Sequence, residues 1–170
     1  PPLGRVLAVY GAKGGVGTTT IAINAAIALH RELGRKVALV DGNLQFVDHR
    51  VFLDLGLDKK SIVDIVTAPT IDQDLVRQVM VEHASGVDLL LAPPSPETAE
   101  LVTQDHMPII VEQLRGLYDY VLIDIDKRLD DINLGILEAA DTMFVVMTAD
   151  LSCLKNVRLV LETIGHLGYS

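Results

Sequence analysis

The ten residues 11–20, GAKGGVGTTT, lie between an apolar run and an alanine-rich helical pattern. The run Arg5 to Tyr10 (RVLAVY) is short, β-branched and followed by glycine, which is typical of a buried parallel strand. The pattern from Thr18 to Leu33 predicts a helix, and Gly34 follows where glycine adopts left-handed backbone at little cost. Strand, glycine loop and helix in this order form a phosphate cradle, with backbone N–H groups turned inward and the positive helix end behind them. An ordinary tight turn is the alternative, but such a turn needs neither the clustered glycines nor the lysine and three hydroxyls.

The rest of the chain continues this alternation of strands and helices. Capping boxes at Ser61–Asp64 and at Thr70–Gln73 predict that short helices begin there, and Ser95 is predicted to restart a helix. A final helix is predicted from Leu151 to Leu167. Strands that are apolar on both faces and alternate with helices predict an α/β fold with a mostly parallel central sheet flanked by helices. Polar loops follow five strands, so we expect them to converge on one sheet edge. Beyond the first, the predicted strands are Val37 to Val40, Val87 to Ala92, Tyr118 to Ile125 and Met143 to Thr148.

Composition limits the classes of protein to which the chain can belong. Its 170 residues are 49% hydrophobic and 22% charged, which indicates one globular domain with a sizeable core. A single cysteine excludes a disulfide framework or a cysteine-rich metal site and favours a reducing compartment. The sequence contains no apolar run of the roughly 18–20 residues that a membrane helix needs. The net charge of −9 and the scattered basic residues argue against DNA as a partner.

The glycine loop departs from the ordinary P-loop pattern, which would place its lysine at residue 18. Thr18 stands there, and Lys13 lies at the front of the loop. This arrangement resembles the deviant Walker A motif of the ParA/MinD superfamily, K-G-G-x-G-[KT]-[ST], and therefore implies a three-layer P-loop NTPase-like fold that binds ATP. The resemblance implies that Lys13 reaches across a nucleotide-sandwich homodimer to the partner's phosphates and that Thr19 ligates Mg²⁺. The residues expected to hold the phosphates are Gly14, Gly15, Val16, Gly17, Thr18, Thr19 and Thr20.

Acidic and amide side chains follow two of the predicted strands. Asp41 and Asp124 end their strands at the same sheet edge, and Asp124 matches a Walker B carboxylate. We expect both to contribute to the Mg²⁺ site, with helix capping or solvation at the strand ends as the alternative. The superfamily usually has a second Asp that prepares the attacking water, and Asn43 takes its place. Asparagine orients water but cannot accept a proton as a carboxylate does. Because loss of one electrostatic contact lowers rates by about 10²–10³-fold, Thr18 and Asn43 predict slow or absent hydrolysis.

Longer segments resemble the CpaE/TadZ pilus-assembly branch of the superfamily. They are residues 18–26, 40–46, 118–124 and 148–156, and the resemblance extends from Arg5 to the end of the chain. Members of that branch often carry an amino-terminal receiver-like domain, which predicts that residues 1–4 are a linker remnant and that residues 5–170 form the ATPase domain. Base contacts in the superfamily come largely from a strand and loop that follow the last helix, so we expect the adenine-contacting portion to lie beyond this chain.

The resemblance implies a bacterial cytoplasmic protein that dimerises on ATP and positions pilus or secretion machinery at a cell pole. A working ATPase for DNA partition or cell division is the alternative, and a metabolic P-loop enzyme is the third interpretation. Asp126-Lys127-Arg128 is either a switch that senses the γ-phosphate or a solvated charged turn, and the sequence favours the turn. The five histidines lack the spacing of metal ligands, so we interpret them as ordinary surface or core residues.

Overall fold

The computed structural model describes residues 2–45, 48–56, 58–125 and 127–168, which form a six-stranded sheet in the order β3-β4-β2-β5-β1-β6. Neighbouring strands are parallel except that β3 pairs antiparallel with β4 at one edge. This arrangement confirms the predicted parallel α/β sheet. The strands are β1 (Arg5–Gly11), β2 (Val37–Asp41), β3 (Val81–Glu82), β4 (Asp88–Leu90), β5 (Tyr120–Ile125) and β6 (Thr142–Val146).

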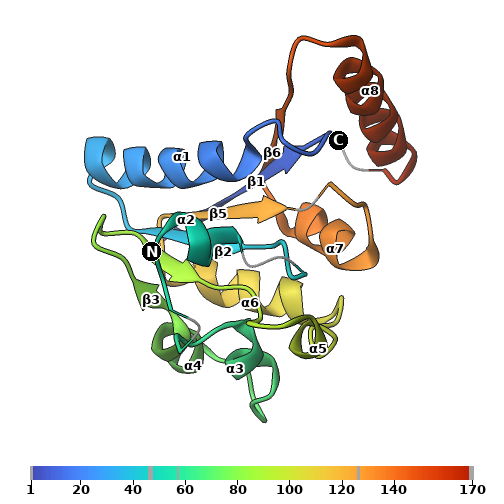
Figure 1. Ribbon diagram of the computed structural model, residues 1–170. Helices are drawn as coiled ribbons and strands as arrows, with labels where there is room; N and C mark the ends of the chain where they lie inside the picture. Colours follow the sequence, from blue (N-terminus) through green and yellow to red (C-terminus); the bar gives the residue numbers. More distant parts are fainter. Residues whose placement is uncertain (1, 46–47, 57, 126, 169–170) are drawn as a thin grey trace.

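Helices cover both faces of the sheet and complete the predicted three layers (Figure 1). The long helix α1 lies along one face, and α6 and α7 lie on the other with α3 and α4 beside them. The last helix, α8, stands beyond the edge strand β6. The helices of the described residues are α1 (Thr18–Leu33), α2 (Asp48–Phe52), α3 (Ile62–Val66), α4 (Gln73–Val79), α5 (Pro96–Ala99), α6 (His106–Arg115), α7 (Asp131–Ala139) and α8 (Leu151–His166).

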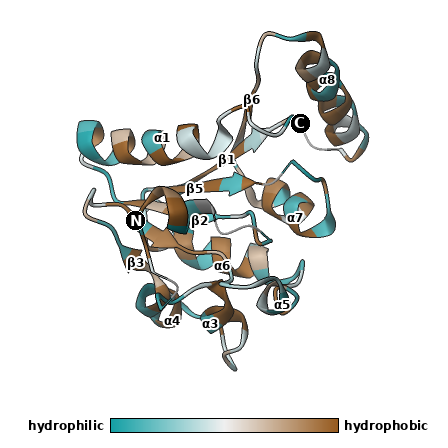
Figure 2. Cartoon of the chain, in the orientation of Figure 1, coloured by the Kyte–Doolittle hydropathy of each residue, from teal (hydrophilic) through white to brown (hydrophobic). Residues whose placement is uncertain are grey.

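The core consists of two apolar clusters, one on each face of the sheet. The cluster under α1 contains Ala22 and Ala26 of that helix, packed against Leu39 and Leu122 of the strands. The larger cluster lies under α6 and α7 and contains Ile110, Leu114 and Ile123 among others. Figure 2 shows hydrophobic residues along much of β5 and α6, and hydrophilic residues at the outer end of α1. The same picture shows β5 turning hydrophilic near its carboxyl end, where the chain begins to form the site.

Local sequence signals explain where several elements begin and end. Helix α1 has the predicted bounds because Gly17 and Gly34 flank it, both with positive φ. The Ser61 capping box is confirmed: Val63 N donates to Ser61 Oγ over 3.3 Å, and Ser61 N donates to Asp64 Oδ2 over 2.8 Å. Ser95 caps α5 as predicted.

Other element boundaries differ from the prediction. The capping box predicted at Thr70–Gln73 is wrong in its cap residue: Asp72 accepts from Leu75 N and is the N-cap of α4, which begins at Gln73. The sequence pattern did not predict α2, α6, α7 or β3. Gly4, assigned there to a linker remnant, is buried and donates to Arg115 O over 2.9 Å. The predictions that fall on Pro1, Phe46, Asp126 and Ser170 lie outside the described residues.

Register brings the predicted site residues to one edge. Asp41 at the end of β2 pairs with Asp124 of β5, and Gly11 at the end of β1 pairs with Val146 of β6. The carboxyl ends of these parallel strands therefore lie side by side, which is where open α/β sheets bind ligands. Across the described residues, none of the helices combines the length and the apolar character needed to cross a bilayer.

Candidate functional site

The glycine loop turns sharply between β1 and α1. Gly15 and Gly17 have φ angles of +79° and +88°, which residues other than glycine rarely adopt. The loop also folds back closely on the strand, since a Cβ on Gly11 would lie 2.0 Å from Thr18 Oγ1. These positions explain the clustered glycines through the backbone path of the loop.

The backbone N–H groups of this loop are available to a ligand. Within the described part of the chain, none of them donates to a protein acceptor at Gly14, Gly15, Gly17, Thr18, Thr19 or Thr20. The first intrahelical bond of α1 is donated by Ile21 N to Gly17 O over 2.9 Å. The first turn of a helix carries unsatisfied N–H groups and the positive end of the helix dipole. The loop and helix start can therefore accommodate an anion such as phosphate.

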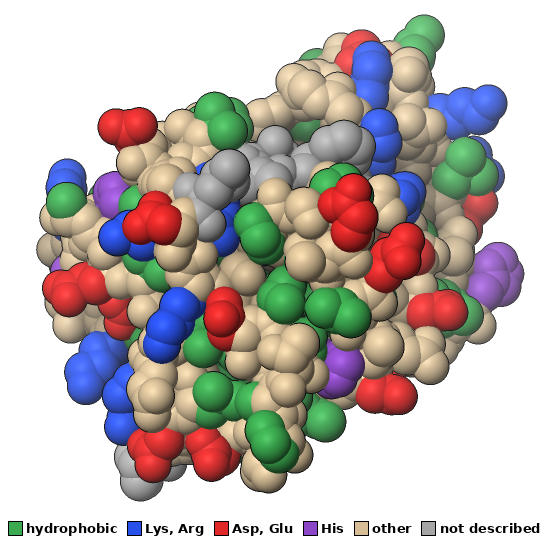
Figure 3. All heavy atoms as spheres, turned by 60° about the horizontal axis from the view of Figure 1, so that its bottom comes forward, with side chains coloured by type: hydrophobic (Ala, Val, Ile, Leu, Met, Phe, Trp, Pro, Cys, Tyr) green, Lys and Arg blue, Asp and Glu red, His purple; other side chains and the backbone are tan. Residues whose placement is uncertain are grey.

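A cavity of about 620 Å³ opens over this loop. Its described lining contains three cationic side chains and one carboxylate, although the chain as a whole has a net charge of −9. On the face drawn in Figure 3, acidic and basic side chains are interspersed without a broad basic area. The concentration of positive charge at the cavity favours a compact anionic ligand. The lining is Gly11, Lys13, Gly14, Gly15, Gly17, Thr18, Thr19, Thr20, Asn43, Gln45, Phe52, Asp124, Ile125, Lys127 and Arg128.

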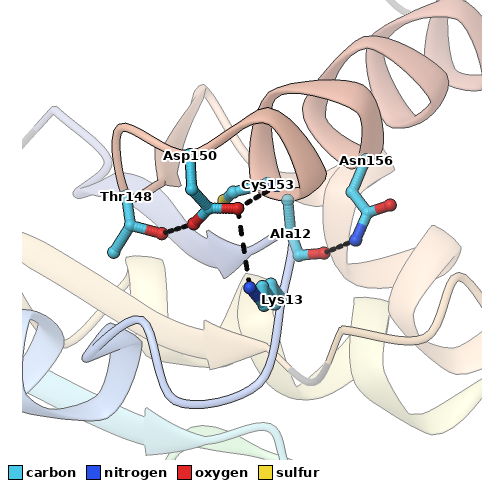
Figure 4. Close-up of polar contacts among 6 residues, drawn as sticks. All are labelled: Ala12, Lys13, Thr148, Asp150, Cys153 and Asn156. Carbon is cyan, nitrogen blue, oxygen red and sulfur yellow. Dashed lines mark hydrogen bonds and ion pairs between the residues drawn. The ribbon is translucent and has the colours of Figure 1, made fainter.

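Lys13 lies at the rim of the cavity, where Asp150 at the start of α8 pairs with it (Figure 4). Its Nζ is 3.5 Å from Asp150 Oδ1, and its side chain is 44% exposed. The Thr148 hydroxyl donates to Asp150 Oδ2 over 2.5 Å and is the main reason that the pKa of Asp150 is lowered. Asn156 of α8 donates to Ala12 O over 3.1 Å. The front of the glycine loop is thus fastened to the first two turns of α8.

Asp124 lines the cavity from the end of β5 and is 2% exposed. His49 of α2, which is fully buried, places its Nε2 3.0 Å from Asp124 Oδ2. This contact fixes one carboxylate oxygen, so α2 determines how Asp124 is oriented at the cavity.

Asp41 lies beside Asp124 but is not among the cavity-lining residues. Its Oδ1 accepts from Asn43 N over 3.2 Å and its Oδ2 accepts from His49 N over 3.3 Å. Burial raises the pKa of Asp41 to about 6; nearby His49 opposes this rise and Asp124 adds to it. Asp41 therefore fixes the backbone segment that follows β2, and this segment leads to His49.

Most of the predicted site residues come together in this cavity. Lys13, Asn43 and Asp124 line it together with the glycines and threonines of the loop. The exceptions are Asp41 and Val16, whose half-buried side chain packs against the apolar core. Val16 is expected to contribute its backbone N–H, for which its side chain direction is immaterial.

Several lining or supporting residues were not assigned to the site from the sequence. Lys127 and Arg128 line the cavity; the sequence favoured a solvated turn at this point, with a switch that senses the γ-phosphate as the alternative. His49 is a core histidine, as interpreted, but its contact with Asp124 has no signature in its spacing. Gln45 and Phe52 line the cavity from the segment after β2, and nothing in the pattern around Phe52 predicts this.

Magnesium fits the oxygen donors at the cavity. Thr19 offers a hydroxyl and Asp124 a carboxylate, and both line the same space as the glycine loop. Mg²⁺ usually takes one or two protein oxygens together with substrate phosphates and water. A cage of three or more His, Cys, Asp or Glu side chains is accordingly absent from the described residues. The donor set therefore suits a metal that arrives with a phosphate ligand.

Comparison with known proteins identifies the family. The model of the AAA_31 family, an AAA domain, matches residues 4–169. The chain belongs to the AAA_31 family. This AAA_31 chain is 29% identical over 172 residues to the septum site-determining protein MinD of Thermotoga maritima. The alignment covers 99% of this chain and 61% of MinD. The match confirms the predicted ParA/MinD superfamily of P-loop ATPases.

Solved structures agree with this placement. A ParA family ATPase from Chlorobium tepidum TLS superposes with a TM-score of 0.87 at 26% identity, over 95% of this chain and 68% of that one. Cobyrinic acid a,c-diamide synthase from Mycobacterium smegmatis, solved with ADP and magnesium, superposes with a TM-score of 0.74 at 26% identity. The superposition covers 96% of this chain and 69% of the synthase chain. The AAA_31 chain spans 55–65% of the length of the curated relatives it matches.

Proposed function

We propose that this AAA_31 chain binds ATP with Mg²⁺ at the glycine loop and uses the nucleotide mainly to close a homodimer. In this proposal the closed dimer positions pilus or secretion machinery of the Flp/Tad type, and hydrolysis is slow or absent. The main observation that supports it is the row of backbone N–H groups at the start of α1 that have no acceptor among the described residues. They face a cavity whose described lining contains three cations and one carboxylate.

The roles proposed for the loop residues follow from their positions. Backbone N–H groups from Gly14 to Thr20 would hold the phosphate oxygens, and Thr19 and Asp124 would hold Mg²⁺. When bound, Mg²⁺ neutralises phosphate charge. Asp41 supports the metal site from behind Asp124 by fixing the backbone of Asn43 and His49. The ADP and magnesium bound to the cobyrinic acid a,c-diamide synthase from M. smegmatis support this choice of ligands.

Slow hydrolysis is proposed because the cavity offers little to activate water. Asn43 lines it where a carboxylate would serve as a base, and an amide does not take up a proton. Asp124 is the one carboxylate among the described lining residues, and it is bonded to His49. ATP then acts as a ligand that stabilises one state, by about 2.7 kcal/mol at 100 times its dissociation constant.

Dimerisation is proposed to depend on Lys13. Its ammonium lies at the exposed rim of the cavity, where a second copy of the chain can approach it. The proposed pilus role rests on the resemblance of residues 40–46 and 148–156 to the CpaE/TadZ branch. In the structure the second segment supplies Asp150, which pairs with Lys13, and Asn156, which binds Ala12 O. Branch-like residues thus contact the loop proposed to bind the nucleotide.

Solution mass and phosphate release test this proposal together. We expect ATP with Mg²⁺ to convert the protein to a dimer that persists for minutes and releases little phosphate. Lys13→Ala should abolish the ATP-linked dimer and keep the fold, whereas Lys36→Ala, at the opposite sheet edge, should leave dimerisation unchanged. A dimer that survives Lys13→Ala contradicts the role assigned to Lys13.

The second candidate is a cycling ATPase of the partition or septum-positioning kind. The identity to MinD of T. maritima favours it, as does the match to the ParA family ATPase of C. tepidum. Rapid phosphate release and a short-lived dimer in the same experiment would support this function over the scaffold.

A further inference from the structure

We propose that Lys127, in the loop after β5, supplies within one chain the positive charge on the nucleotide phosphates that Thr18 does not provide. This inference rests on the proposed nucleotide-binding function and assigns a phosphate-binding residue that the P-loop pattern does not contain. It also replaces the interpretation of Lys127 as part of a solvated turn.

The position of the Lys127 ammonium is the first observation. Its Nζ lies 3.7 Å from the point that a Cβ on Gly14 would occupy, so the charge sits over the front half of the glycine loop. Lys127 lines the same cavity as Gly14 and Thr18. A phosphate bound by the loop N–H groups would therefore meet this ammonium without a partner subunit.

The backbone around Lys127 is held by buried side chains, which is the second observation. Tyr10 of β1 is 2% exposed, and its hydroxyl donates to Lys127 O over 2.7 Å. Asn133 of α7 is 3% exposed, and its Nδ2 donates to Arg128 O over 2.8 Å. Asp130 then caps α7 by accepting from Asn133 N over 3.0 Å. Buried side chains thus fix the carbonyl groups of the consecutive residues Lys127 and Arg128. This is expected of a preorganised binding site and not of an unconstrained turn.

The charge requirement explains why such a lysine is needed. Stabilisation of phosphate groups depends on positive charge placed by the protein. Thr18 stands at the position of the P-loop lysine with a neutral hydroxyl, and it lies against Gly11 at the base of the loop. Lys13 pairs with Asp150 of α8. Among the three cations of the described lining, Lys127 is the one whose ammonium lies over Gly14.

Calorimetric titration with Mg-ATP, Mg-ADP and AMP tests the inference. We expect Lys127→Ala to weaken Mg-ATP binding about tenfold, the lower end for a charge-assisted hydrogen bond, because the side chain is exposed. The loss for AMP should be smaller, since fewer phosphate oxygens reach the ammonium. Lys127→Arg should keep the affinity, and Lys36→Ala, which removes a lysine at the other sheet edge, should not change it.

Two further variants separate the charge from its support. Thr18→Lys in the Lys127→Ala background returns a lysine to the P-loop position and should recover most of the lost affinity. Tyr10→Phe keeps the ring but removes the donor to Lys127 O, and we expect a loss of a few-fold, with a cooperative thermal transition confirming that the chain is folded.

The outcomes distinguish this inference from the proposed function. A wild-type chain that binds no nucleotide overturns both. Wild-type binding that Lys127→Ala leaves within twofold overturns the role of Lys127 alone, and so does equal weakening by Lys36→Ala. A loss specific to Lys127→Ala that Thr18→Lys recovers supports the inference.

Discussion

Replacing His49 by leucine tests the contact that orients Asp124, the carboxylate proposed to hold Mg²⁺. Both ends of the bond are buried: the His49 side chain is 0% exposed, that of Asp124 is 3% exposed, and the two atoms are 3.0 Å apart. Leucine fills a similar volume, so the penalty for an empty cavity is small. What remains is a buried carboxylate oxygen without its donor, which destabilises a protein by about 1.5–3 kcal/mol.

Urea unfolding followed by circular dichroism at pH 7.5 without Mg²⁺ measures this loss. Because the urea dependence for small proteins is about 1–3 kcal/mol per molar, the midpoint should fall by roughly 1 M. His166→Leu, an exposed histidine at the end of α8, is the matched control and should change stability by less than about 0.5 kcal/mol.

A second measurement separates stability from orientation of the site. With Asp124 no longer held, His49→Leu should weaken ADP binding in the presence of Mg²⁺ more than in its absence. A variant as stable as the wild type, with an unchanged Mg²⁺ effect, would refute the claim that His49 positions Asp124.

Three more predictions address the loop, the buried acid and the core. The pKa of Asp41 is raised to about 6 in the folded chain, so the folded state binds more protons than the unfolded state between pH 4 and 6. The free energy of unfolding should therefore fall by up to about 3 kcal/mol as pH rises through this window. Asp41→Asn should remove this component, and a wild-type-to-variant stability difference that is the same at pH 4.5 and pH 7.0 would contradict it. Gly17→Ala places a Cβ at φ +88° and should lower the free energy of unfolding by about 1–2 kcal/mol, measured by urea titration. Leu114→Ala, at a fully buried core position, should lower it by about 2–5 kcal/mol, whereas Leu159→Ala on α8, half exposed, should cost clearly less.

The sequence predicted those parts of the fold whose signals are local. The glycines at residues 17 and 34 mark both ends of α1, and the Ser61 and Ser95 caps mark the starts of α3 and α5. Parallel strands followed from apolar runs alternating with helices, and this alone placed Asp41 and Asp124 at one edge.

The remainder depends on contacts between distant residues. His49 contacts Asp124 across 75 positions of the chain, and Tyr10 fixes the backbone of Lys127 across 117. Neither pair leaves a periodic pattern, so a histidine without ligand spacing and a charged turn were the natural interpretations. Asp41 and Asp124 are neighbours in register, but only the folded backbone of Asn43 and His49 decides which carboxylate lines the cavity.

The most direct test of the account is an NMR titration of the backbone amides with Mg-ADP. We expect the largest shifts at the N–H groups of Gly14, Gly15, Gly17, Thr18, Thr19 and Thr20, because these groups have no protein acceptor among the described residues and face the cavity. AMP, with a shorter phosphate chain, should shift them less. If the resonances of these amides stay unchanged and the largest shifts occur elsewhere on the chain, the claim that this loop holds the phosphates is contradicted.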